Sequence, residues 1–156
     1  MVIESVPQKM IAGHAFHPFG LCNQFSRWQY LMSLDMSVEV LPKYVQIELL
    51  GVYTFSDLMQ QVDRFRAEAD NAGKNQILID ARSIEGRMTE SEKFFVGTRI
   101  AEVFGARLRM AIIAPPGHVT KMGEMAAINR GARLFVTESE AEATEWLEKT
   151  SSSVQP

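Results

Sequence analysis

The spacing of apolar residues along the chain changes repeatedly between a period of two and a helical period, so strands and helices should alternate. Two β-rich runs come first, residues 38–41 and 44–50, and the Pro42-Lys43 pair between them predicts an antiparallel hairpin. Every second residue at the start of the later run is apolar. This strand should therefore bury one of its faces.

Two amphipathic helices follow, and each has recognisable ends. Thr54 can cap a helix that ends at Gly73, while Thr89 and Glu92 form a capping box for a helix that ends at Gly105. The apolar residues expected to face inward are Phe55, Leu58, Val62, Phe65 and Ala69 in the first helix and Phe95, Val96, Ile100, Val103 and Phe104 in the second.

Three further runs predict strands. Residues 76–81 and 108–114 lack the polar alternation of a half-exposed strand, and residues 133–136 are rich in β-branched and aromatic side chains. Because a helical pattern separates each strand from the next, parallel strands joined by right-handed crossovers are expected. The element order is ββαβαβαβα. It predicts a single α/β domain with a mixed, mainly parallel five-stranded sheet and about four helices.

The last two helices are also delimited by local signals. Thr120 is a candidate cap for the third helix, in which Met122, Met125 and Ala126 are expected to face inward. Thr137 and Glu140 have the spacing of a capping box for the last helix. The inward face of that helix should contain Ala143, Trp146 and Leu147.

The beginning of the chain has a different character. Residues 1–35 lack clean periodicity and are interpreted as an N-terminal extension, residues 36–150 as the α/β domain, and residues 151–156 as a frayed tail. Within the extension, Gln24–Leu34 has the spacing of a short amphipathic helix. Its apolar face could pack on the domain, on a second copy of the chain, on a partner or at a membrane interface.

Composition narrows the function classes. The chain has 156 residues, of which 46% are apolar and 22% charged, which is ordinary for one soluble globular domain. Its formal charge is −3 and no basic stripe is present, so nucleic acid is not an expected partner. No stretch approaches the roughly 20 apolar residues that span a bilayer, so integral membrane association is not expected.

The few cysteine and histidine residues suggest neither disulfides nor metal. Cys22 is the only cysteine, and no secretion signal begins the chain, so we expect a cytoplasmic protein. His14, His17 and Cys22 have an H-x2-H-x4-C spacing, but zinc sites normally present four ligands at recognisable spacings. No metal or other cofactor is predicted.

Residues 37–149 resemble the STAS domain superfamily, which comprises sulfate-transporter and anti-sigma-factor-antagonist domains and their stage II sporulation AA-like relatives. The resemblance is carried by the segments ELLGVYTFSDL, ILIDAR, ARLRMAIIA and RLFVTESEAEATEWL, in this order. The last segment is typical of small bacterial members. The resemblance implies a STAS-like fold and a regulatory module that binds other proteins.

The resemblance also implies a phosphorylation switch. In regulatory members, a serine or threonine at the start of the helix after the ILIDAR-like strand is phosphorylated, which here corresponds to Thr89 or Ser91. The Asp-Ser-Ser-Gly sequence of the family is absent, and Glu90 and Glu92 already place negative charge there. A helix cap explains Thr89 without phosphorylation.

Ligands of open α/β sheets bind outside the carboxyl ends of the parallel strands. Five residues are expected at that edge: Tyr53, Asp80, Arg82, His118 and Thr137. Asp80 could act as a general base if burial raised its pKa, or it could accept hydrogen bonds from the loop that begins at Arg82. His118 could titrate near neutral pH.

Three function classes follow. The first is a non-catalytic regulatory or protein-interaction module of STAS type, with a protein partner and a candidate homodimer. The second is a domain that binds a small apolar ligand or lipid at the strand ends, suggested by Met122 and Met125, because methionine adapts to irregular apolar ligands. The third, least supported, is an enzyme that uses Asp80 and His118.

Overall fold

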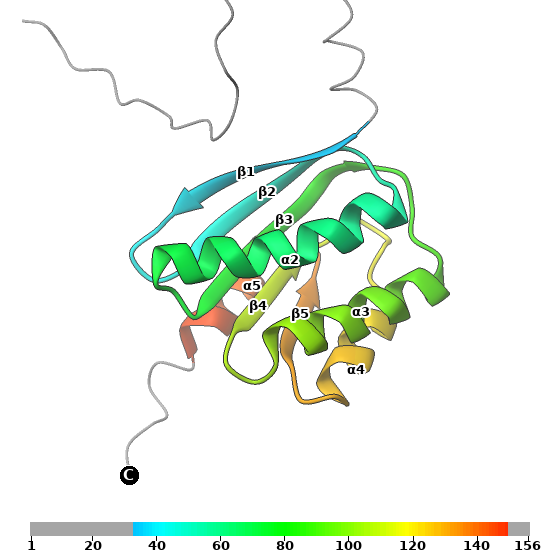
Figure 1. Ribbon diagram of the computed structural model, residues 1–156. Helices are drawn as coiled ribbons and strands as arrows, with labels where there is room; N and C mark the ends of the chain where they lie inside the picture. The colour runs from blue at the N-terminus through cyan, green and yellow to red at the C-terminus, as the bar shows by residue number, and fades with distance from the viewer. Residues whose placement is uncertain (1–32, 150–156) are drawn as a thin grey trace, which may run out of the picture.

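The computed structural model describes residues 33–149, which form one five-stranded sheet and four helices (Figure 1). In chain order the elements are β1 (Leu34–Val40), β2 (Val45–Val52), α2 (Phe55–Ala72), β3 (Gln76–Glu85), α3 (Glu90–Phe104), β4 (Arg109–Ile113), α4 (Met122–Ile128), β5 (Arg133–Thr137) and α5 (Glu140–Glu148). This order confirms the predicted ββαβαβαβα arrangement.

The strands lie in the sheet in the same order as in the chain, β1-β2-β3-β4-β5. β1 pairs antiparallel with β2, and all other pairs are parallel. Figure 1 shows α2, α3 and α4 on one face of the sheet and α5 on the other. The predicted mixed α/β sheet is therefore confirmed, and the carboxyl ends of four parallel strands meet at one edge.

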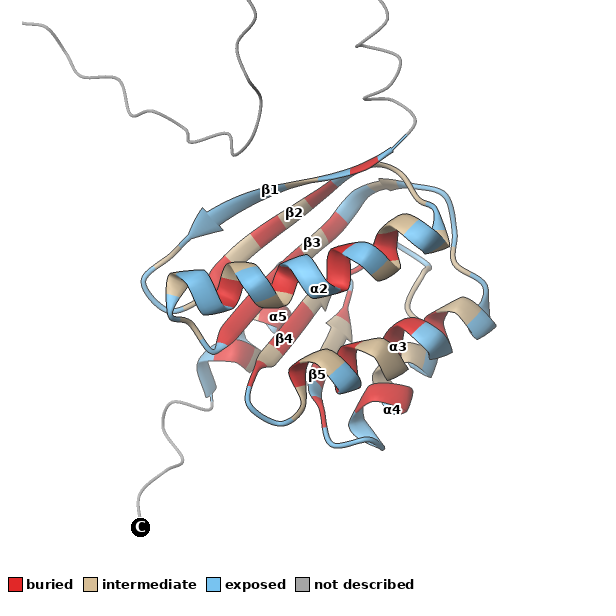
Figure 2. Cartoon of the chain, viewed as in Figure 1, coloured by how far each residue is buried: buried red, intermediate tan, exposed pale blue. Residues whose placement is uncertain are grey.

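Two apolar cores hold the layers together (Figure 2). The larger core lies between the sheet and α2, α3 and α4, and it includes the fully buried Val45 and Ile47 of β2. The smaller core lies under α5 and consists of Leu78, Ala111, Ile113, Ala143 and Leu147. The two cores take alternate residues of β3, as a strand covered on both faces requires.

The first strand differs from its prediction. β1 begins at Leu34, not at residue 38, because it pairs along its whole length with β2, from Leu34 opposite Gly51 to Val40 opposite Val45. Most β1 side chains are exposed, which is why the apolar pattern marked only part of the strand. Leu34, predicted to end a helix, lies in this strand, and the rest of the Gln24–Leu34 prediction lies outside the described residues.

The caps of the first two helices are confirmed. The Thr54 side chain accepts a hydrogen bond from the backbone N–H of Asp57, and Gly73 ends α2 in the left-handed conformation, with φ of 64°. Thr89 and Glu92 form the complete capping box of α3. Local sequence was sufficient here because each cap is made within one turn.

The predicted capping box at Thr137 is wrong. Ser139 caps α5 and accepts a hydrogen bond from the backbone N–H of Glu142, while the Thr137 hydroxyl donates to the Glu142 carboxylate. Both hydroxyl residues have a glutamate three positions later. β5 extends through Thr137, so the helix begins later and Ser139 is the residue that caps it.

The predicted inward face of α4 is wrong for its two methionines. Met122 is 40% and Met125 59% exposed, whereas Ala126 is buried as predicted and Ala127 is buried beside it. Lys121, not Thr120, occupies the cap position, and no side chain caps the helix start.

A close contact between helices explains this orientation. A Cβ atom built on Gly97 of α3 would lie 2.1 Å from the carbonyl oxygen of Gly123 in α4. The two helices are too close for long side chains between them, so the residues of α4 that face inward are small. Two other residues were predicted to face inward and do so only in part or not at all. Phe95 of α3 is 54% exposed, and Trp146 of α5 is half-buried.

Among residues 33–149, no helix is both long and apolar enough to span a membrane.

Candidate functional site

The sheet divides the residues predicted at its carboxyl edge into two groups. Asp80 follows Leu78 on the α5 face, and Thr137 bonds to a side chain of α5. Tyr53 and His118 instead line a cavity on the face covered by α3 and α4. The five predicted residues therefore do not form one site.

Asp80 on the α5 face is held by Arg82. Its carboxylate accepts hydrogen bonds from the Arg82 backbone N–H at 3.1 Å, from Nε at 2.9 Å and from a terminal guanidinium nitrogen at 2.6 Å. The hydrogen bonds from Arg82 hold the pKa of Asp80 below its ordinary value. Arg82 also pairs with Glu140 at the start of α5. A carboxylate kept ionised in this way is a weak base, which favours a structural role.

A β-bulge lies in β3 just after Asp80. Glu48 of β2 lies opposite Asp80, whereas Leu50 lies opposite Ser83, so β3 contains one extra residue between these pairs. Bulges redirect side chains next to the ends of strands. The sequence did not predict this bulge, because it depends on the pairing with β2.

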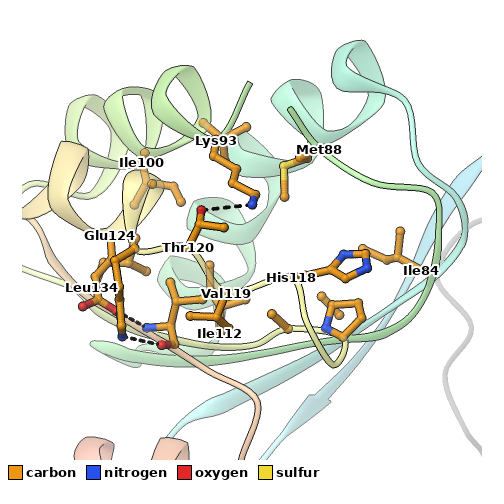
Figure 3. Close-up of a pocket in the computed structure, with 18 of the residues that line it drawn as sticks. Ile84, Met88, Lys93, Ile100, Ile112, His118, Val119, Thr120, Glu124 and Leu134 are labelled. Carbon is orange, nitrogen blue, oxygen red and sulfur yellow. Dashed lines mark hydrogen bonds and ion pairs between the residues drawn. The ribbon is translucent and has the colours of Figure 1, made fainter. Parts of the chain in front are cut away.

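The cavity at the carboxyl edge has a volume of about 110 Å³ and lies between the sheet, α3 and α4 (Figure 3). Most of its wall is apolar and comes from Ala81, Ile84, Met88, Val96, Ile100, Ile112, Val119, Leu134 and Val136. Its polar lining includes Tyr53, Lys93, His118 and Thr120. Lys93 and Thr120 were not among the predicted site residues.

Lys93 is a buried cation, with 8% of the residue exposed. Its Nζ donates to the Thr120 hydroxyl at 3.0 Å (Figure 3) and to Glu90 Oε1 at 2.8 Å. The Thr120 hydroxyl donates to the second Glu90 oxygen at 2.9 Å. The hydrogen bond from Lys93 lowers the pKa of Glu90. This triad joins α3 to the loop before α4. The sequence signal was a lysine in the apolar stripe of a helix.

The Tyr53 hydroxyl is buried in the same region, near Glu92, and makes no hydrogen bond of ordinary geometry within the described chain. Burial raises the pKa of Tyr53 to about 12, and the nearby negative charge of Glu92 adds to the effect. The phenol therefore stays neutral at physiological pH and can still donate one hydrogen bond.

Lys121 and Glu124 cover the outer edge of β5. Lys121 Nζ donates to the Val136 carbonyl at 2.8 Å, and Glu124 accepts from the Val136 N–H at 2.6 Å. The two side chains also pair with each other at 2.9 Å. Lys121 has φ of 64° and is the only non-glycine residue with positive φ among residues 33–149. The outward N–H and carbonyl of Val136 in this edge strand are thus occupied by side chains from the start of α4.

The candidate phosphorylation residues lie at the start of α3. The Thr89 hydroxyl accepts from the Glu92 N–H at 3.2 Å and donates to the Glu92 carboxylate at 3.0 Å. Ser91 is exposed in the same turn. A phosphate on Thr89 would replace a cap and meet the Glu92 carboxylate.

An exposed apolar surface covers the outer side of the helix layer. It consists of Phe94, Phe95, Met122, Met125 and Ile128, which we call the α3–α4 surface. Phe95 makes edge contacts with Phe55 of α2 at 6.4 Å and with Phe94 at 5.7 Å between ring centres. Arg130 lies over the Phe94 ring at 5.1 Å. Exposed apolar groups that gather in this way are typical of binding surfaces.

The residues with metal-like spacing, His14, His17 and Cys22, lie outside the described residues. Within residues 33–149, no group of three or more histidine, cysteine, aspartate or glutamate side chains has an arrangement that could hold a metal ion.

No protein-family model matches the chain, and no curated protein matches it. Solved structures do. An anti-sigma factor antagonist from Mycobacterium paratuberculosis is 13% identical, with a TM-score of 0.51, and the match covers 74% of this chain and 94% of that one.

Two further structures are similar. A DUF3478-family protein with a SpoIIAA-like fold, from Shewanella loihica PV-4, is 20% identical with a TM-score of 0.48, covering 75% of this chain and 95% of that one. The unphosphorylated anti-sigma factor antagonist SpoIIAA is 16% identical with a TM-score of 0.44, covering 74% and 97%. The first likeness confirms the STAS-like fold expected from the sequence.

Proposed function

We propose that this protein is a regulatory protein-interaction module of STAS type that binds its partner through the α3–α4 surface. The observation that carries the proposal is the gathering of exposed apolar side chains there, with Phe95 at 54%, Met125 at 59% and Ile128 at 48% exposure. Large apolar side chains without a covering element mark interaction sites. The fold shared with an anti-sigma factor antagonist supports a regulatory role for this chain.

The chemistry of the α3–α4 surface favours a partner that presents apolar side chains. Aromatic and methionine residues are enriched at protein interfaces, and methionine adapts to varied apolar contacts. The nearby cation Arg130 already stacks on Phe94 and donates to the Ala126 carbonyl at 2.9 Å. The surface therefore offers apolar area rather than a free charge.

Phosphorylation is not required by this proposal. Thr89 already makes two hydrogen bonds with Glu92, and a phosphate on Ser91 would stand next to Glu90 and Glu92 in the sequence. Like charges repel a phosphate at such a position. The role of Thr89 as a helix cap accounts for the structure around it.

The test compares two lysine substitutions. Wild type, Phe95→Lys and the control Leu50→Lys are expressed with an affinity tag in the native cells, crosslinked, and their bound proteins are quantified by mass spectrometry. Leu50 is a suitable control because it is 39% exposed and lies on β2, outside the helix layer. We expect one protein that is retained by Leu50→Lys and reduced at least tenfold by Phe95→Lys.

The candidate partner is then purified and titrated against the same three proteins. Binding that follows the same order supports the proposal. Equal binding by wild type and Phe95→Lys would place the interface elsewhere, and a lack of any bound protein would remove the basis for the proposal.

The second candidate function is the binding of a small molecule in the cavity. The observation that favours it is the Tyr53 hydroxyl, which is buried without a hydrogen-bond partner in the described chain. The cavity of about 110 Å³ is far smaller than the roughly 300 Å³ of ordinary ligand sites, and the outward Met122 and Met125 do not contribute to a lipid site. Only a compact molecule, close to benzene in size, would fit.

Phenol is a suitable probe for this candidate, because it combines a small ring with a polar group that can bond to Tyr53. Backbone amide NMR shifts of residues around the cavity are followed during a phenol titration, with Ala114→Leu as a variant that fills the wall. Saturable shifts that Ala114→Leu abolishes would support the site. Unsaturable shifts, or shifts that persist in the variant, would contradict it.

A further inference from the structure

The two edges of the sheet are unlike each other. At β5, the N–H and carbonyl of Val136 are occupied by Glu124 and Lys121. Fewer side chains reach the outer edge of β1 among residues 33–149. Gln61 Nε2 of α2 donates to the Leu34 carbonyl at 3.4 Å, and the Met36 N–H donates to the Asp35 side chain at 2.8 Å, but no side chain of this part of the chain bonds to the backbone of Val38 or Val40. Open edge strands are templates for pairing with another strand, and proteins usually block them.

The hydrogen-bond pattern shows which backbone groups of β1 point outward. Leu41 donates to the Tyr44 carbonyl at 2.9 Å, where the chain turns from β1 to β2. Bonded pairs alternate in an antiparallel ladder, so the odd-numbered residues of β1 face β2. The even-numbered residues Met36, Val38 and Val40 then direct their N–H and carbonyl groups away from the sheet. The bond from the Met36 N–H to the Asp35 side chain agrees with this direction.

The same three residues place their side chains on the α2 face of the sheet. Met36, Val38 and Val40 lie opposite Leu49, Ile47 and Val45, which belong to the larger core. α2 does not cover this row completely, because Val38 is 36% and Val40 59% exposed. The open edge therefore carries an apolar row, which we call the β1 row.

A second copy of the chain fits this edge in one register. If a twofold axis passes through Val38, Met36 lies opposite Val40 of the other copy, and the two Val38 side chains face each other. Ser37 then lies opposite Glu39, and no like charges are paired directly. Cross-strand apolar pairs stabilise a sheet, whereas opposed like charges destabilise it.

The neighbouring registers are worse. An axis through Ser37 would place Asp35 opposite Glu39 of the other copy, and symmetry would repeat this repulsion. An axis between two residues would set members of the apolar row opposite Ser37 or Glu39. The alternation of charge and apolar side chains in β1 thus selects the axis through Val38.

We propose that two copies of this chain pair through antiparallel β1 strands about a twofold axis at Val38, which joins their sheets into one. In this arrangement the outward N–H and carbonyl groups of Met36, Val38 and Val40 bond to those of the partner copy, and the Met36 N–H exchanges its bond to Asp35 for one across the interface. The side chains of the two β1 rows then lie next to each other on the α2 face, and the exposed edges of the joined sheet are the two β5 strands, where Lys121 and Glu124 occupy the backbone groups of Val136. The dimer is independent of the α3–α4 surface.

Sedimentation of the full chain tests the proposal. Wild type should sediment at twice its mass of 17.5 kDa at micromolar concentration. Val38→Lys brings two ammonium groups together on the axis and should raise the dissociation constant at least tenfold. Val40→Lys, at the more exposed position, should act in the same direction. The control Leu50→Lys, on the other face of β2, should leave the dimer intact.

Amide hydrogen exchange identifies what covers the edge. The N–H groups of Val38 and Val40 should exchange slowly in the wild-type dimer and quickly in Val38→Lys, while the circular dichroism of both proteins remains the same. A wild-type monomer with slow exchange would show that residues 1–32 cover β1, and it would overturn the proposal. A monomer with fast exchange, or a dimer that persists in both lysine variants, would overturn it as well.

Discussion

A few residues combine a clear local function with a clear measurement, and Thr89 is the simplest. Its side chain caps α3 in a capping box, and Ser91, two positions later, is exposed in the same turn. Replacement of a capping threonine by alanine costs about 1 kcal/mol. We expect Thr89→Ala to lower the free energy of unfolding by about that amount in urea, and Ser91→Ala to change it by less than about 0.5 kcal/mol. Equal effects would show that the cap is not formed.

The contacts of Asp80 with Arg82 should make the stability of the protein depend on pH. The hydrogen bonds from Arg82 hold the pKa of Asp80 in the folded state below its ordinary value of 3.8. Its contribution to stability is therefore complete above that value and is lost as the pH falls through the lower, folded-state pKa. We expect Asp80→Asn to be less stable than wild type at pH 7, and the difference should shrink near pH 3. Urea unfolding at the two pH values measures it; a constant difference would contradict the ion pair.

Lys93 raises a question about buried charge. Its ammonium group has two hydrogen-bond partners, Glu90 and Thr120, but its desolvation opposes their effect. Methionine keeps the apolar stem in the cavity wall without the charge. We expect Lys93→Met to change the free energy of unfolding by less than about 1 kcal/mol and Lys93→Ala to lower it by about 2 kcal/mol or more. A large loss of stability in Lys93→Met would show that the hydrogen bonds among Lys93, Glu90 and Thr120 themselves stabilise the contact between α3 and the loop before α4.

The helices α3 and α4 behave as one packed element because two glycines allow close contact. A Cβ on Gly97 would lie 2.1 Å from the Gly123 carbonyl oxygen, whereas a Cβ on Gly123 would lie 3.0 Å from the Lys93 carbonyl oxygen. Alanine favours an isolated helix by about 1 kcal/mol over glycine, but overpacking costs about 1–3 kcal/mol. We expect Gly97→Ala to be destabilising and more so than Gly123→Ala, as measured by thermal and urea unfolding. The reverse order would contradict the close contact.

Elements differed in how well the sequence predicted them. β4 and the first part of β3 were predicted because they are covered on both faces, and α2 because its cap and apolar stripe are local. The continuation of β3 from Arg82 to Glu85 was predicted to be a loop, because most of its side chains are exposed. The outward orientation of Met122 and Met125 in α4 was not predicted, since the contact between Gly97 and Gly123 joins residues that are distant in sequence. The length of β1 was missed for a related reason: its pairing with β2, rather than burial of its own side chains, makes it a strand.

The candidate sites could be predicted only in part at the scale of the whole molecule. Tyr53 and His118 do line the cavity at the carboxyl edge, as the topology of parallel strands suggested. Asp80 and Thr137 lie at the same edge but on the other face, which separates them from the cavity. Alternation along β3 puts Asp80 on the same face as Leu78, but only the structure shows that α5 covers that face. Lys93 was missed because it reaches the cavity from a helix.

Pairing through β1 would link stability to concentration, since a dimer that dissociates on unfolding has a midpoint that depends on protein concentration. We expect the thermal midpoint of the wild type to rise when its concentration is raised from about 1 to 100 μM. The midpoint of Val38→Lys should stay constant over that range, and Phe95→Lys should behave as wild type, because the α3–α4 surface is not part of this interface. A constant midpoint for the wild type would show that folding does not depend on pairing. The same shift in wild type and Val38→Lys would place the self-association on a surface other than the β1 row.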